Sequence, residues 1–183
     1  MQLRSDIQIQ SVLKAMSDVV LPALDPHNQI AQEQARLCMG LLDLMARQLP
    51  LQFRFDCDEL TRLVALSKQL LPLPDLGRAT DTSRAKLAED TRLADDVLLR
   101  ARAEPQEVLD AVRALRASTG AVVQEACAQG DGSATAQLER AVFDASREQL
   151  LRDRSWLLAQ RWEPNPDAIA AIDTLIAPVG AAR

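Results

Sequence analysis

Charged side chains within the most apolar stretch of the sequence are the first candidates for chemistry. Asp43 lies inside the apolar run from Leu37 to Ala46, with Arg47 four residues after it and Arg36 seven residues before it. A carboxyl group buried there could do acid–base work, because burial raises its pKa. The same spacing fits an Asp43–Arg47 ion pair on one edge of a helix, and we favour this structural interpretation.

A second candidate is a set of arginines that recur every seven residues near the end of the chain. Its members are Arg140, Arg147, Arg154 and Arg161. Aligned guanidinium groups could hold an acidic partner, a phosphate or a carboxylate ligand. Pairing with Asp144, three residues before Arg147, and with the acids of residues 82–103 is the favoured alternative. If the set is a docking surface, replacing Arg147 and Arg154 with alanine weakens association and leaves the melting temperature nearly unchanged.

The residue types that most catalytic and metal sites require are sparse. His27 is the single histidine, and the three cysteines, Cys38, Cys57 and Cys127, are far apart without a C-x-x-C pair. The acids of residues 82–103 do not form the Glu-x-x-His pattern of a di-iron bundle, and no nucleophile-elbow, phosphate-loop or dinucleotide glycine motif occurs. We therefore predict no catalytic residue, no metal site and no cofactor.

The helix that must carry Arg36, Asp43 and Arg47 is predicted at the centre of the fold. Asp25-Pro26 is a helix start signal and Pro50 a stop signal, so the helix spans the whole apolar stretch between them. Apolar residues on nearly every side are typical of a helix that others surround. Gly40 is costly inside a helix, and close approach of another backbone would explain it.

The rest of the chain also reads as helices. Apolar positions alternate at three and four residues over 82–103 and from Pro105 to a turn at 130–133, which is the pattern of antiparallel bundle helices. Residues 51–55 alternate like an extended connector. We predict an all-α, mainly antiparallel bundle of six or seven helices in one domain, 1–183, with a possible seam at residues 72–78. The other predicted helices are 5–21, 56–71, 133–161 and 166–176.

Composition limits the partners. The net charge is −5, and aromatic residues make up only 3% with no tyrosine. Both values disfavour nucleic acid as a partner, because nucleic-acid modules are basic and many stack bases on aromatic rings. The sequence has no signal-peptide pattern and no apolar run long enough for a membrane span. We expect a cytoplasmic protein with reduced thiols.

The first 50 residues carry a resemblance. Three segments, Val19–Leu24, Gln34–Leu37 and Leu44–Leu49, resemble the start of a group of small bacterial helical proteins. Those proteins are encoded beside aminoglycoside-phosphotransferase-like kinases and acyl-CoA dehydrogenases. The resemblance implies an accessory role in acyl-CoA-related catabolism, and it assigns no functional residue.

Two functional hypotheses follow. The first is a non-catalytic interaction protein that binds an enzyme or a second copy of itself. The second is a small-molecule-binding protein or enzyme with a pocket between helices, near Arg36, Asp43 and Arg47 or beside the arginines. A large exposed apolar patch favours the first, and a closed cavity of mixed polarity favours the second. The sequence favours the first and names no ligand.

Overall fold

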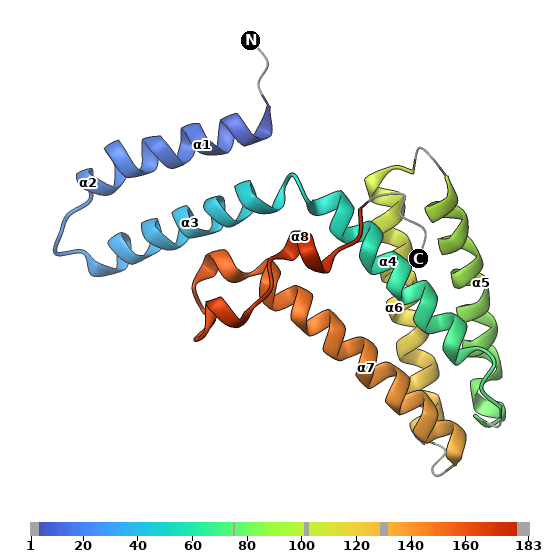
Figure 1. Cartoon of the computed structure of the whole chain (residues 1–183). Coiled ribbons are helices and arrows are strands. Elements are labelled where there is room, and N and C mark those ends of the chain that lie inside the picture. Colours follow the sequence, from blue (N-terminus) through green and yellow to red (C-terminus); the bar gives the residue numbers. More distant parts are fainter. Residues whose placement is uncertain (1–3, 75, 101–102, 129–131, 179–183) are drawn as a thin grey trace. The chain divides into compact units, whose positions relative to one another are not determined.

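The computed structural model describes residues 4–74, 76–100, 103–128 and 132–178. Within these residues the chain is all-α, without strands, and its helices pack as the predicted mainly antiparallel bundle (Figure 1). None of the described helices is both long and apolar enough to cross a membrane.

The chain divides into two compact units. Unit 1 comprises residues 1–52 and 152–175, and unit 2 comprises residues 53–151 and 176–183. The seam expected at residues 72–78 lies inside unit 2. The single domain remains a prediction, because two compact units of one chain can still unfold together.

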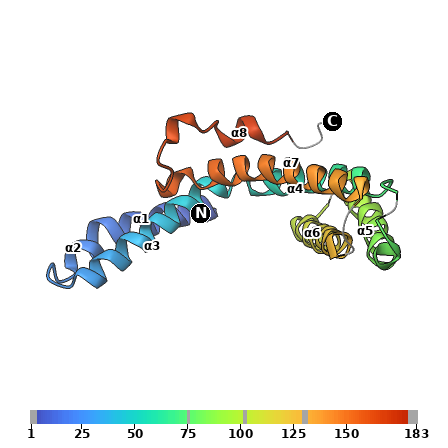
Figure 2. The ribbon, with the colours of Figure 1, turned by 90° about the horizontal axis from the view of Figure 1, so that it is seen from below.

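Unit 2 is a bundle of four helices. They are α4 (Gln52–Leu70), α5 (Asp81–Leu99), α6 (Pro105–Ala128) and the part of α7 (Ser133–Trp156) that ends at Leu151. Helices α5 and α6 lie side by side in both ribbon views (Figures 1 and 2). Each helix contributes one leucine with 0% of its surface exposed: Leu60, Leu87, Leu115 and Leu138. The predicted spacing of α5 and α6 is confirmed, since their apolar positions face this core.

Unit 1 is built on a helical hairpin. Helix α1 (Ser5–Ala15) continues through a π-helical turn, η1 (Met16–Val20), into α2 (Leu21–Ala23), and α3 (Gln29–Gln48) returns beside α1 (Figure 1). The π-helical turn ends two residues before Pro22, whose missing N–H disturbs the regular hydrogen-bond ladder. After α7, the short turns η3 (Leu158–Gln160) and η4 (Pro166–Ala168) lead to α8 (Ile172–Leu175).

Several predicted boundaries are wrong. Helix α3 begins three residues later than Pro26, because the side chain of Asn28 caps it by accepting a hydrogen bond from the Ala31 N–H at 3.0 Å. Residues 51–55 are mostly the first turn of α4 rather than a connector. Helix α7 ends at Trp156, and only short turns and α8 occupy the range 166–176. Residues 130 and 131 of the turn expected at 130–133 lie outside the described residues, and residue 133 begins α7.

The predicted burial of α3 is also wrong. Only Ala35 and Leu44 are buried on this helix, whereas Ile30 is 77% exposed and Leu41 is 53% exposed. A Cβ added at Gly40 would meet no atom within 4 Å, so no backbone in the described chain approaches there. Helix α3 is apolar on most sides, but too few neighbours cover it.

The bundle core gives a first stability test. Replacing Leu115 with alanine removes a fully buried side chain and is expected to lower the free energy of unfolding by about 2–5 kcal/mol. Leu99 is 85% exposed, so its replacement by alanine should change that free energy by no more than about 0.5 kcal/mol. Urea denaturation followed by circular dichroism measures both, and equal losses would contradict the bundle.

Candidate functional site

Helix α3 presents two open faces of opposite character. Arg36, Asp43 and Arg47 share one sector of its circumference, at about 100° per residue. A second sector, about 130° away, is the apolar face of α3. It consists of Ile30, Leu37, Leu41 and Met45. Both α1 and η3 pack against α3, yet they leave these two sectors open.

The charged sector forms the floor of an open groove of about 620 Å³ in unit 1, the α3 groove. Glu33, Arg36 and Asp43 line it from α3, Leu13 lines it from α1, and residues 159–162 line its other side. The side-chain amide of Gln160 reaches across to donate to the Gly40 carbonyl at 3.3 Å. The structure therefore brings two predicted site residues, Arg36 and Asp43, into one groove of mixed polarity.

Asp43 is neither buried nor isolated. Arg47 Nε donates to Asp43 Oδ2 at 3.0 Å, and the two side chains are 67% and 42% exposed. An exposed pair of this kind contributes about 0–1 kcal/mol. Arg36 donates to Gln32 Oε1 at 3.3 Å and forms no ion pair within the described chain. The structure thus gives Asp43 the structural pairing that its spacing predicts, and it offers no buried carboxyl group for acid–base chemistry there.

The apolar face of α3 is the feature that sequence reasoning misplaced. Leu37, Leu41 and Met45 are each about half exposed, at 49%, 53% and 54%. Val12 of α1 and Val19 of η1 are exposed as well, at 47% and 65%. Exposed aliphatic residues that recur along one helix face are typical of an interaction site. The periodicity revealed these residues, but not that they remain uncovered.

The arginines of the second candidate do not act as one set. Arg154 donates two hydrogen bonds to the carboxylate of Glu163, at 2.9 and 2.6 Å, and these bonds lower the pKa of Glu163. Arg161 lies beyond the end of α7, in a left-handed conformation with φ of 58°. Arg140 and Arg147 remain exposed on α7, and within the described residues neither forms an ion pair. Replacing both Arg147 and Arg154 therefore perturbs two different environments, an exposed arginine without an ion pair and an arginine bonded to Glu163.

The acids of α5 do not neutralise these arginines in the described chain. Asp95 pairs with Lys68 at 2.7 Å, and Glu89 pairs with Arg92 at 2.7 Å. Asp90, which is buried, pairs with Lys86, and Asp96 pairs with Arg100. No group of three or more metal-ligating side chains occurs among the described residues.

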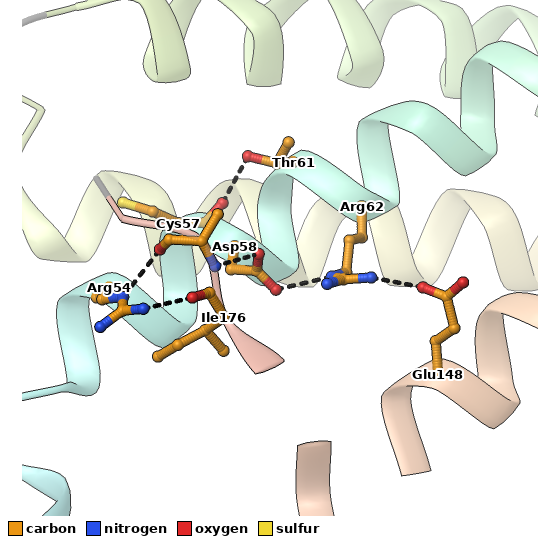
Figure 3. Close-up of polar contacts among 8 residues, drawn as sticks. Arg54, Cys57, Asp58, Thr61, Arg62, Glu148 and Ile176 are labelled. Carbon is orange, nitrogen blue, oxygen red and sulfur yellow. Dashed lines mark hydrogen bonds and ion pairs between the residues drawn. The ribbon is translucent and has the colours of Figure 1, made fainter. Parts of the chain in front are cut away.

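A polar cluster around the buried Asp58 forms a clamp on the segment that follows α8 (Figure 3). Arg54 of α4 donates to the carbonyl oxygens of Ile176 and Ala177, the latter at 2.9 Å. Asp58, whose side chain is 1% exposed, accepts the Ala177 N–H at 2.9 Å and Arg62 Nε at 2.7 Å. These three hydrogen bonds to residues 176 and 177 are to backbone atoms, so they position a chain segment.

The clamp continues to α7 in unit 2. Arg62 Nη1 contacts Glu148 Oε2 at 2.5 Å, and Ile176 itself is only 3% exposed (Figure 3). Sequence reasoning missed this cluster, although the repeat Arg54, Asp58, Arg62 at four-residue spacing was a visible signal of one charged helix edge. Its neighbour Cys57 is half-buried, and burial, with a smaller effect from Asp56, raises the pKa of its thiol.

The chain matches no family model, no curated protein and no solved structure.

Two Asp–Arg pairs at the same spacing allow a matched test of the clamp. Asp58→Asn breaks a buried pair and is expected to lower the free energy of unfolding by about 3 kcal/mol, because it leaves charged and polar partners unsatisfied. Asp43→Asn breaks an exposed pair and should cost no more than about 1 kcal/mol. Urea denaturation measures both variants. Similar costs would mean that the clamp contributes no more than a surface ion pair.

Thiol reactivity tests the burial of Cys57. A raised pKa leaves a smaller fraction of thiolate at any pH below it, and the thiolate is the reactive form. Cys57 should therefore react with iodoacetamide more slowly than the exposed Cys127. Peptide mass spectrometry after timed quenching separates the two rates. A Cys57 that reacts as fast as Cys127 contradicts the described packing.

Proposed function

We propose that this protein is a non-catalytic interaction protein that assembles through the apolar face of α3, and that the occupant of this face is a second copy of the chain. The observation that carries the proposal is the exposure of Ile30, Leu37, Leu41 and Met45, which recur along one side of a 20-residue helix. Leaving such side chains in water forgoes about 1.5–3 kcal/mol for each one that could be fully buried.

A second copy suits this face for two reasons. Its sector of α3 carries no charged residue, so two copies can meet there without burying an unpaired charge. The face also runs along a continuous helix, and an antiparallel pair about a two-fold axis near Leu41 brings Leu37 of one copy to Met45 of the other. Homodimer interfaces are apolar in this way, and Val12 of α1 and Val19 of η1 provide further exposed apolar surface.

The solution mass tests the proposal. Light scattering over a concentration series should show twice the mass of one chain at high concentration. Leu41→Glu should raise the dissociation constant at least about tenfold, a loss of about 1.4 kcal/mol, because it introduces a charge at the axis. Leu93→Glu, at a residue of α5 that is 46% exposed, is the matched control and should leave the mass unchanged. A monomer at every concentration overturns the dimer.

Cys38 reports on the same face without a substitution. It is exposed in one chain and lies on α3 beside Leu41 and Met45, whereas Cys127 is exposed on α6. Dimer formation should slow the alkylation of Cys38 as the protein concentration rises and leave Cys127 unaffected. In the Leu41→Glu variant the dependence on concentration should disappear. Equal rates for Cys38 at all concentrations would place the contact elsewhere.

The resemblance of residues 19–49 supports a cellular setting for this interaction protein. We include in the proposal an accessory role in acyl-CoA-related catabolism in the bacterial cytoplasm, where three free thiols stay reduced. An acyl-CoA dehydrogenase from the same cell is then the first enzyme to mix with the purified protein. A complex by light scattering, or a change in the activity of the dehydrogenase, is the expected result. If neither effect is observed, the accessory role is ruled out, and the dimer still depends on its own test.

A further inference from the structure

A second exposed surface lies on α7 in unit 2. It consists of three large apolar residues and two arginines, and we call it the α7 strip: Arg140, Phe143, Arg147, Leu150 and Leu151. At about 100° per residue its centre lies about 180° from Leu138, the side chain of α7 that is fully buried in the bundle core. The α7 strip therefore points directly away from the core that holds unit 2 together.

The apolar residues of the α7 strip have no evident role in folding unit 2. Phe143 is 65% exposed, Leu150 is 57% exposed and Leu151 is 49% exposed. Phenylalanine occurs only three times in the sequence, and Phe55, by contrast, is 8% exposed. Phe143 and Leu150 are seven residues apart, so they stand two turns apart along the same edge, which is the spacing of anchors that face a partner helix.

The charges of the α7 strip are of one sign and are not neutralised nearby. Arg140 and Arg147 flank Phe143 on the helix surface, and within the described chain neither guanidinium group has an ion-pair partner. Asp144 lies three residues before Arg147 but is not within ion-pair distance of it. Glu148 is committed to Arg62 at 2.5 Å. The α7 strip thus combines apolar anchors with two available guanidinium groups.

We propose that the α7 strip binds an amphipathic helix of a partner protein that carries aspartate or glutamate beside its apolar residues. Phe143 and Leu150 anchor the apolar side of that helix, and Arg140 and Arg147 receive its carboxylates, with geometry suited to two parallel hydrogen bonds. The charge of the strip, opposite to that of the partner, fixes its orientation and excludes basic helices. Because the strip lies in unit 2 and the apolar face of α3 lies in unit 1, this inference goes beyond the proposed dimer.

An anionic membrane surface is the competing occupant. Basic residues next to apolar ones also occur on helices that lie in a lipid interface. The α7 strip has only two basic residues over three turns, fewer than the clusters of basic residues that bind anionic membranes. This small number favours an acidic protein helix.

The test uses two synthetic helical peptides with the same leucine face, one flanked by glutamates and the other by lysines. Fluorescence anisotropy of the labelled peptides should show binding of the glutamate peptide, weakened by added salt, and no binding of the lysine peptide. Arg147→Gln and Phe143→Ser should each weaken binding at least about tenfold. Arg78→Gln and Leu99→Ser are the matched controls, since Arg78 is an exposed arginine without an ion pair in the described chain and Leu99 is 85% exposed.

Four other outcomes would contradict the inference. If the glutamate peptide fails to bind, or if both peptides bind equally, the partner of the α7 strip is not an acidic helix. Binding unaffected by Arg147→Gln places the contact elsewhere. Co-sedimentation with phosphatidylserine vesicles, without binding of the glutamate peptide, makes a membrane the occupant. The Leu41→Glu variant should bind the glutamate peptide as the unmodified chain does, because Leu41 belongs to unit 1 and the α7 strip to unit 2. The melting temperatures of all variants should stay close to that of the unmodified chain.

Discussion

The burial of one leucine from each of four helices is the interaction on which unit 2 depends. Leu60, Leu87, Leu115 and Leu138 are each 0% exposed, and the remaining core residues gather around them. Two buried hydroxyl groups within this core are paired with each other, since Thr91 donates to Ser67 at 2.9 Å between α5 and α4. Because inward-facing side chains hold the bundle, the outer faces of its helices are available for other uses.

Helices α5 and α6 could be predicted closely because each has one apolar and one polar side. Spacings of three and four residues identified Leu87, Ala94, Val112 and Leu115 as inward-facing, and all four are buried. Helix α3 gave the opposite result. Its apolar residues lie on most sides of the helix. This pattern shows which side chains would gain from burial, but not whether other helices of the chain cover them. Periodicity describes one element, whereas burial depends on the others.

The candidate sites show the same limit. Asp43 and Arg47, four residues apart on one helix, form the expected pair because that geometry is local. Arg161 does not lie on the same helix as the other predicted arginines, because α7 ends at Trp156. No proline or glycine between residues 133 and 161 signals that end. The charged edge of Arg54 and Asp58 was visible in the sequence, but its contact with residues 176 and 177 could not be predicted, since Asp58 and the Ala177 N–H that it accepts are 119 residues apart.

The discontinuity of unit 1 has a consequence for synthesis on the ribosome. Its first segment ends at Gln52 and its second begins at Arg152, so α1 and α3 emerge well before the residues that complete their unit. At about 5–20 residues per second, roughly 100 intervening residues take about 5–20 s to translate. Throughout that interval the leucine and methionine side chains of the nascent hairpin are exposed to solvent, including those on the apolar face of α3. During that time, chaperones and neighbouring nascent chains compete to bind the exposed hairpin.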